Sequence, residues 1–348
     1  MRHRDVHRGL KLNRVVEMRT FRTQSDQLRF GRRFPRMTFR LRFLGACAGL
    51  AGAVVAGWAE APPVAAQPPA TAKPTAERTA AQRLFDSWKA PIPPRHLVGN
   101  IYYVGAVGVS SFLITTPAGH ILLDTGFADT VPIIQSGVAQ LGFRLADIKF
   151  ILNSHAHFDH AGGLARMKEL TGARVIASAA DARVLASGGR DDFIPFPKDM
   201  TVYEPVVADG IVADGDTVAL GGVVLTAHLT PGHTRGATTW TMDVADDGRN
   251  YHVVFFSSAS INAGTSLRQH PAYPEIVADF ETTFARLKAL PCDIFLAPHG
   301  LQFGLADKFA RLDRGEKPNP LVDPEGWHAL LDASERAFRQ QLAAETPK

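Results

Sequence analysis

Cysteine is nearly absent from this chain, since its 348 residues include only Cys47 and Cys292. Two cysteines can form one bridge at most, so a small fold held by a disulfide framework is excluded. Cys47 lies in an amino-terminal segment that resembles an export signal, and its removal would leave a single thiol. Residues 88–348 must therefore be held together by a hydrophobic core, and they are numerous enough for one large domain.

Basic charge is also scarce outside the amino terminus. Residues 1–42 contain 13 Lys and Arg against 3 acidic residues, whereas residues 43–348 contain 25 basic and 31 acidic ones. The overall charge of +4 thus comes from the amino terminus, and the body carries −6. Nucleic-acid binding depends on a basic surface, so this charge pattern argues against it.

A long apolar run is missing as well. The run at 43–58 is short, rich in Ala and Gly, and followed by small residues and Pro, which favours a cleaved signal over a membrane anchor. We expect a signal peptide at 37–66 and export to the periplasm, by the general or the twin-arginine route. Residues 1–36 are interpreted as translation from a start codon set too early, and 67–87 as a flexible lead-in.

Strand and helix patterns alternate through residues 88–348. Apolar runs broken by Gly and Pro predict strands within 101–125, 148–154 and 217–258, and 3.6-residue periodicity predicts helices at 130–142, 161–172, 274–290 and 321–344. Both halves contain both kinds of element, which predicts an α/β fold with two sheets inside and helices outside. The segment 187–213 is irregular and could overhang a site.

One short stretch, "NSHAHFDHAGG" at 153–163, holds four metal-ligand side chains: His155, His157, Asp159 and His160. The helical zinc motif places its histidines at i and i+4, whereas these residues lie at i, i+2, i+4 and i+5. In a turn after a buried strand, the first two can face one metal ion and the last two another. A catalytic zinc takes about three protein ligands, so two further ligands are expected downstream. The alternative is an ordinary polar loop.

The two missing ligands are predicted to be His233 in "LTPGHTRG" and His299 in "DIFLAPHG". Each follows an apolar strand pattern and lies in a turn next to glycine, as the cluster at 155–160 does. Turns that follow strands can meet at one edge of stacked sheets. The other histidines downstream of the signal lack this context and are expected at the surface or in packing.

These motifs, with "ILLDTGF" at 121–127, resemble the metallo-β-lactamase superfamily, whose fold is an αββα sandwich of two mixed sheets with helices outside. The resemblance covers roughly residues 88–339. It implies a first Zn²⁺ on His155, His157 and His233, and a second on Asp159, His160 and His299. It also implies that Asp124 orients the ligands from behind. A turn-capping role for Asp124 is equally consistent with the sequence.

The residues after the strand pattern "YHVVFF" indicate which members of the superfamily the chain resembles most. Glyoxalase II and acyl-homoserine lactonases resemble each other in an Asp there that bridges both metals, but this chain reads "SSAS" at 257–260. The pattern is similar to class B β-lactamases of the third subclass. This resemblance implies that Ser258 and Ser260 bind the substrate carboxylate. The chain departs from the pattern of this subclass at two positions. Thr265 lies where relatives often have Tyr, and Cys292 lacks the second cysteine with which relatives often form a disulfide.

The resemblance therefore implies an exported hydrolase with two Zn²⁺ per chain that opens the β-lactam ring of penicillins, cephalosporins and carbapenems. A zinc-bound hydroxide would attack, and Asp159 would both bind zinc and aim the hydroxide. The expected partner is a small β-lactam, without nucleic acid or a stable membrane association, and the chain is expected to be a monomer. Two alternatives to a β-lactamase stay open: a lactonase or thioesterase of the same fold, and a zinc-binding protein without catalytic activity.

Overall fold

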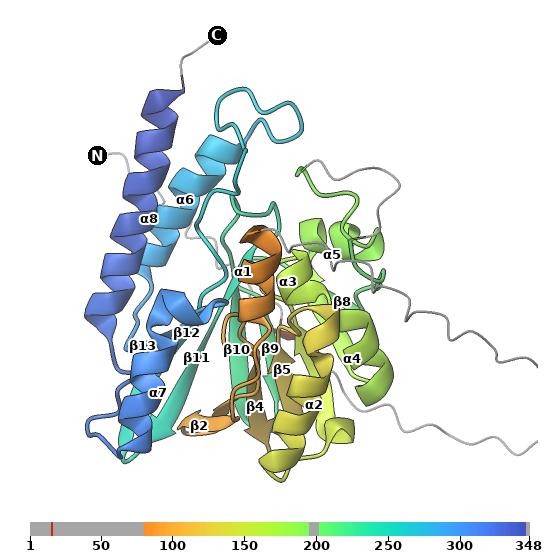
Figure 1. The fold of residues 1–348 in the computed structure, drawn as a ribbon, viewed down its shortest axis with the longest axis vertical. Helices are drawn as coiled ribbons and strands as arrows, with labels where there is room; N and C mark the ends of the chain where they lie inside the picture. Colours follow the sequence, from red (N-terminus) through yellow and green to blue (C-terminus); the bar gives the residue numbers. More distant parts are fainter. Residues whose placement is uncertain (1–14, 17–79, 195–201, 346–348) are drawn as a thin grey trace, which may run out of the picture. The chain divides into compact units, whose positions relative to one another are not determined.

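Two β-sheets pack face to face, and helices cover the outer face of each (Figure 1). The computed structural model describes residues 15–16, 80–194 and 202–345. In sheet order, the first sheet consists of β2 (Arg95–Val98), β3 (Ile101–Tyr103), β4 (Phe112–Thr116), β5 (Gly119–Leu123), β6 (Ile148–Leu152), β7 (Arg174–Ser178) and β8 (Gly210–Val212). The second consists of β1 (Val15–Val16), β9 (Thr217–Leu220), β10 (Val223–Leu229), β11 (Thr238–Asp246), β12 (Arg249–Phe255) and β13 (Ile294–Leu296). This αββα sandwich confirms the predicted fold class.

Three helices cover the outer face of the first sheet: α2 (Val131–Gln140), α4 (Leu164–Thr171) and α5 (Ala179–Ala186) (Figure 1). Each buries a stripe of apolar residues against the sheet, and the fully buried Leu164 and Met167 supply that of α4. Gly172 ends α4 in the left-handed conformation, at φ +67°, as the predicted glycine stop requires.

A larger apolar core fills the space between the sheets and extends beneath α6 (Ile276–Ala289) and α8 (Pro324–Ala344). Phe112 of the first sheet contacts Phe255 of the second, with ring centroids 5.5 Å apart. Cys292 packs half-buried against this core as a free thiol, and burial raises its pKa to about 12, so it stays neutral. The remaining helical segments are α3 (Phe158–Ala161), α7 (Leu305–Asp313), η1 (Ala128–Thr130), η2 (Leu145–Asp147) and η3 (Gly300–Phe303).

The amino-terminal side of the domain differs from the sequence interpretation. The flexible lead-in was expected to reach residue 87, but α1 (Ala80–Trp88) is a helix whose Phe85 packs against Phe127 and Phe158. Pro and Ala composition hid this helix, because its stability comes from aromatic contacts made far along the chain. Val15–Val16 pairs in parallel with β9, whereas the predicted signal at 37–66 lies outside the described residues. Among the described helices, none is long and apolar enough to cross a membrane.

Candidate metal centre

Five loops that follow strands meet at one edge of the sandwich. Asp124 follows β5, the 155–160 cluster follows β6, and His233 follows β10. The serine stretch at 257–260 follows β12, and His299 follows β13. The strand–turn pattern in the sequence therefore locates the loops correctly. Asp159 and His160 lie in α3, a single helical turn, rather than in the irregular turn that was expected.

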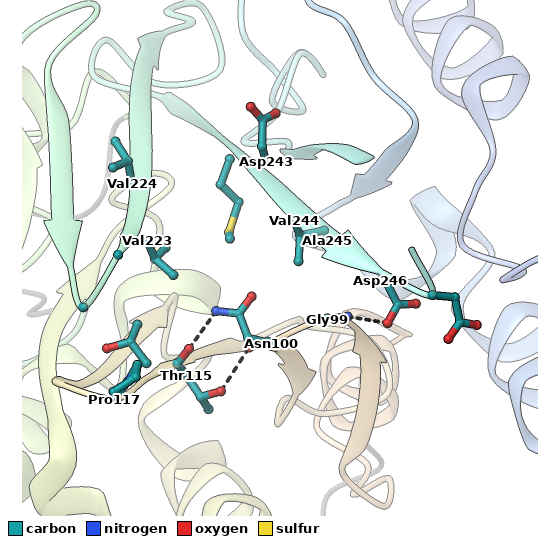
Figure 2. Close-up of a pocket in the computed structure, with 15 residues that line it drawn as sticks. Gly99, Asn100, Thr115, Pro117, Val223, Val224, Asp243, Val244, Ala245 and Asp246 are labelled. Atoms are coloured by element: carbon teal, nitrogen blue, oxygen red, sulfur yellow. Dashed lines mark hydrogen bonds between the residues drawn. The ribbon is translucent and has the colours of Figure 1, made fainter. Parts of the chain in front are cut away.

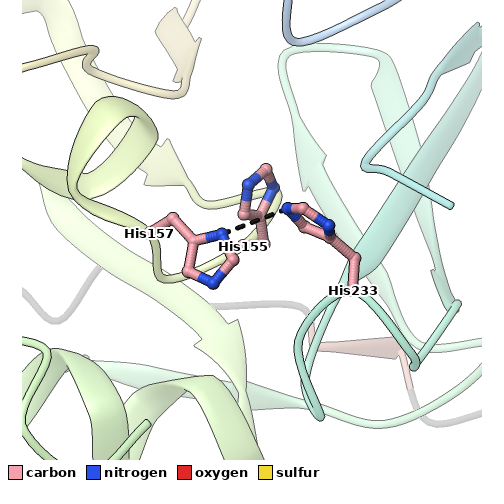
Figure 3. Close-up of side chains that lie close together, drawn as sticks. All are labelled: His155, His157 and His233. Atoms are coloured by element: carbon pink, nitrogen blue, oxygen red, sulfur yellow. Dashed lines mark hydrogen bonds between the residues drawn. The ribbon is translucent and has the colours of Figure 1, made fainter. Parts of the chain in front are cut away.

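His155, His157 and His233 form the first group of ligands, with one ring nitrogen of each within 4.8 Å of the others. Nδ1 of His157 lies 3.1 Å from Nε2 of His233. Figure 3 shows the three rings converging on a common point from two loops. These are the residues that the sequence analysis assigned to the first metal.

His155, Asp159 and His160 form the second group, again with ligand atoms within 4.8 Å of one another. His299 joins this group, because its Nε2 lies 3.3 Å from Nε2 of His160 and 3.6 Å from Oδ2 of Asp159. All six predicted ligands are thus brought together, and His155 lies close to both groups.

The outer nitrogens of two rings show which nitrogen carries the proton. Nδ1 of His233 lies 2.8 Å from the carbonyl oxygen of Ser260, and Nδ1 of His299 lies 3.0 Å from that of Gly108. A carbonyl oxygen only accepts, so each Nδ1 must donate, and the inner Nε2 of the neutral ring is left with a free lone pair.

The same reasoning applies to His155. Ser154 Oγ lies 2.6 Å from the Asp124 carboxylate and Ser257 Oγ lies 2.9 Å from the carbonyl oxygen of Ser154, so both hydroxyl protons are already donated. These hydroxyls lie 3.1 Å and 3.4 Å from Nδ1 of His155 and can only accept from it. Its Nε2 is therefore free to bind a metal.

Electrostatics favour the metal-binding form of four of the ligands, whereas for His160 the carboxylates of Asp159 and Asp124 outweigh burial and raise the pKa. Burial lowers the pKa of His155 and His233 well below the ordinary histidine value, and that of His299 to about 4. Burial alone would raise the pKa of Asp159, but the neighbouring His160 and His299 outweigh it and lower that pKa. At neutral pH these three rings are neutral and Asp159 is an anion. Lone pairs from imidazoles and one carboxylate suit Zn²⁺, so the residues fit the predicted metal.

Asp124 lies directly behind the ligands. It accepts hydrogen bonds from the backbone N–H and hydroxyl of Ser154, at 2.8 and 2.6 Å, and Nδ2 of Asn153 lies 3.3 Å away. One of its oxygens is 3.8 Å from Nδ1 of His160. Burial raises the pKa of Asp124 to about 6, against the opposing effects of His160 and Ser154. Its position agrees with a ligand-orienting role as well as with fixing the turn.

Ser258 and Ser260 lie beside the metal centre, the first buried and the second exposed, with their hydroxyl oxygens 3.1 Å apart. The structure adds a contact that the sequence did not indicate. The hydroxyl and carbonyl oxygens of Ser260 both lie near Nδ1 of His233, at 3.2 and 2.8 Å. Asn262 donates to the carbonyl oxygen of His233 at 2.7 Å. Ser260 therefore contacts a predicted ligand, and its binding of substrate stays a prediction.

Asp181, in the first turn of α5, was missed by the sequence analysis. It is fully buried and accepts from the backbone N–H groups of Ala156 and Gly236, at 2.9 and 3.0 Å, and from the hydroxyl of Thr234 at 3.1 Å. One carboxylate thus ties the loop of His155 and His157 to the loop of His233. No local pattern marks such a residue, because all its partners are distant in sequence.

Trp88 was also missed, because no motif next to it in the sequence marks it as part of the site. Its ring centroid lies 4.8 Å from that of His299. Gly108, whose carbonyl accepts from His299, leaves no room for a side chain, since an added Cβ would lie 2.4 Å from Cα of Trp88. Helix α1 therefore covers one side of the second group.

A separate cavity of about 790 Å³ lies at the opposite ends of β5 and β10 (Figure 2). Hairpin turns such as Gly221–Gly222 line it, with three aspartates among the lining residues. Each carboxylate already has a partner: Asp243 contacts His252 at 2.6 Å, Asp246 accepts from the N–H of Gly99 at 3.2 Å, and Asp247 pairs with Lys317. The cavity holds none of the predicted site residues.

Comparison with known proteins agrees with this geometry. A family model described as the metallo-beta-lactamase superfamily matches residues 104–246. The FEZ-1 metallo-β-lactamase from Legionella gormanii is 41% identical, with 73% of this chain and 96% of that chain covered and a TM-score of 0.71. BJP-1, a subclass B3 metallo-β-lactamase of Bradyrhizobium japonicum, is 40% identical, with 74% and 96% covered and a TM-score of 0.70.

Curated relatives carry a different name. A hydroxyacylglutathione hydrolase from Rhodopseudomonas palustris is 29% identical over 185 residues, or 53% of this chain and 59% of that protein. A second, from Maricaulis maris, is 31% identical over 120 residues and 37% of its length. The chain therefore spans about a third to three fifths of the length of these relatives, whereas it spans 96% of the length of FEZ-1 and of BJP-1.

Proposed function

Since the chain belongs to the metallo-β-lactamase superfamily, we propose that it is a zinc-dependent β-lactamase of the B3 kind. Water adds across the strained amide: the carbonyl carbon gains the hydroxyl, the C–N bond breaks, and the ring nitrogen gains a proton. Bound at the two ligand groups, Zn²⁺ supplies Lewis acidity that activates water near neutral pH and polarises the carbonyl. His155, His157 and His233 would hold one ion, and Asp159, His160 and His299 the other.

The residues around the metals have separable tasks in this proposal. Asp159 keeps unused acceptor capacity on its carboxylate and orients the attacking water by accepting a hydrogen bond from it. Ser258 and Ser260 donate hydrogen bonds to the substrate carboxylate. Trp88 covers His299 and excludes bulk water from that side, which strengthens the electrostatic interactions inside.

One observation favours a β-lactamase over the other hydrolases of the superfamily. The residues after β12 are serines, whereas the resemblance implies that glyoxalase II and the lactonases have a metal-bridging Asp at this place. Ser257 Oγ lies 3.4 Å from Nδ1 of His155, so this position does adjoin the metal ligands. A serine hydroxyl there acts as a hydrogen-bond partner of the ring rather than as a bridging carboxylate. A thioesterase is the second candidate, because the curated relatives are hydroxyacylglutathione hydrolases.

The test compares three substrates on one zinc-loaded preparation: the chromogenic cephalosporin nitrocefin, a homoserine lactone and a hydroxyacyl-glutathione thioester. We expect kcat/KM for nitrocefin to exceed the other two by at least an order of magnitude. Faster cleavage of the lactone or the thioester than of any β-lactam would assign the chain to the competing activity, with the metal centre unaffected.

We also propose that the protein is exported to the periplasm and that its signal is cleaved after Ala66. A β-lactamase has to meet its substrate near the cell wall, and residues 37–66 have the composition of a signal peptide. Mass spectrometry of the secreted or periplasmic form should then find an amino terminus at Gln67. A mature protein that retains Met37 would contradict cleavage at this site.

A further inference from the structure

Asp192 lies behind the first group of ligands, on the loop that follows α5. Gly188 and Gly189 turn the chain at φ +65° and +88°, a backbone region that favours glycine. This turn directs the loop back toward the metal centre. The Asp192 side chain is only 4% exposed, whereas its neighbour Asp191 is exposed to solvent.

The carboxylate of Asp192 adjoins one metal ligand. Its Oδ2 lies 3.1 Å from Nε2 of His157, while the backbone N–H of Ile194 lies 3.5 Å from Oδ1. Nε2 of His157 is buried and has no other hydrogen-bond partner among the described residues, and the Asp192 carboxylate is the acceptor that lies beside it. An ionised carboxylate can only accept, and a buried N–H left without an acceptor is costly.

His157 differs from the other rings in the nitrogen that faces the metal. In His233 and His299 the inner nitrogen is Nε2, and their Nδ1 atoms donate to backbone carbonyl oxygens. In His157 the inner nitrogen is Nδ1, which lies 3.1 Å from Nε2 of His233. Its outer nitrogen is Nε2, for which the nearby acceptor is a side chain that a point substitution can remove.

We infer that Asp192 is a positioning residue that holds the proton of His157 on Nε2 and so keeps Nδ1 free to bind the metal. The inference rests on the metal centre of the proposed function but not on its substrate. A purely structural ion pair is the competing account. It would stabilise the loop without changing which nitrogen of His157 is protonated, and the two accounts therefore differ in metal affinity and in tautomer.

The first measurement is zinc affinity by competition with a chromophoric chelator, using the whole mature protein. Removing an outer partner of a ligating histidine typically weakens metal binding by roughly 10- to 100-fold, so Asp192→Ala should weaken one of the bound ions by this factor. Asp192→Asn keeps an acceptor oxygen and should lose less. Asp191→Ala removes a neighbouring exposed carboxylate of the same loop and serves as the matched control, with affinity expected to stay near wild type.

The second measurement is the ¹⁵N spectrum of histidine-labelled protein without metal, with His157 assigned by the resonance that His157→Ala removes. In metal-free protein, Nε2 of His233 competes for the ring proton as an acceptor 3.1 Å from Nδ1 of His157, but the Asp192 carboxylate should outweigh it because it is charged. Wild type should therefore show the Nε2–H tautomer, and Asp192→Ala should shift the ring toward Nδ1–H. Unchanged affinity and tautomer in a folded Asp192→Ala protein would overturn the inference. A loss shared by Asp191→Ala would overturn it too, because the loop rather than the contact would then matter. A wild type that binds zinc without cleaving β-lactams leaves the inference intact and rejects only the proposed substrate.

Discussion

Replacing Asp159 with alanine should reduce kcat for nitrocefin by several orders of magnitude. The substitution removes an oxygen that lies 3.3 Å from Nε2 of His160 and 3.6 Å from Nε2 of His299, so the second ion would lose one of its three protein ligands. It also removes the acceptor proposed to orient the attacking water, and misorientation of a reacting group by about 1 Å can cost roughly 100-fold. Both losses act on the chemical step, so they should appear in kcat.

Ser260→Ala provides the matched comparison for Asp159→Ala. It deletes a hydroxyl beside the metal centre but retains the backbone carbonyl that accepts from His233, so the metal ligands should stay in place. A hydrogen bond to a charged group contributes about 1.5–3 kcal/mol, which corresponds to a roughly ten- to hundredfold fall in kcat/KM, mainly through KM.

Steady-state kinetics with zinc analysis of each variant separates the two effects. Equal losses in Asp159→Ala and Ser260→Ala, at full zinc occupancy of both, would contradict the roles assigned to these residues. Saturating zinc that restores Asp159→Ala to wild-type turnover would show that the carboxylate only binds metal and does not orient water.

The ligand set could be predicted from the sequence because its chemistry is local. Four ligands lie within six consecutive positions, and the other two share one pattern of apolar strand, turn and histidine. In a sandwich, turns that follow strands reach the same edge, so the pattern predicts where His233 and His299 lie even though they are 73 and 139 residues beyond His160.

The supporting residues could not be predicted, because their partners are set by tertiary packing. Asp181 accepts from residues in two distant loops, and Asp192 meets His157 only after two glycines turn the chain back. Trp88 ends helix α1, most of which lies in a segment whose composition indicates a flexible lead-in. In each case nothing in the neighbouring sequence marks the residue as functional, because its partners belong to segments that are brought close only by folding.

Removal of zinc should abolish β-lactam hydrolysis, and its return should restore the activity. None of the proposed steps uses a serine or cysteine nucleophile, and the one cysteine of the domain, Cys292, is a half-buried thiol in the core with a pKa raised to about 12 by burial. Dialysis against a chelator should therefore lower the rate to that of the uncatalysed reaction. The thermal midpoint should fall as well, because a ligand at about 100 times its Kd stabilises the folded state by roughly 2.7 kcal/mol.

Titration of the metal-free protein tests how many ions the centre needs. Activity should rise with added Zn²⁺ and level off at two ions per chain, as the two groups of three ligands predict. Mg²⁺ is the control, since it prefers oxygen ligands and should not restore activity at a site built mainly from imidazoles. Full activity at one zinc per chain would contradict a dinuclear centre, and full activity with no zinc bound would reject metal-dependent hydrolysis altogether. The first outcome would leave one of the two ligand groups sufficient for catalysis, whereas the second would leave all six converging ligands without a catalytic role.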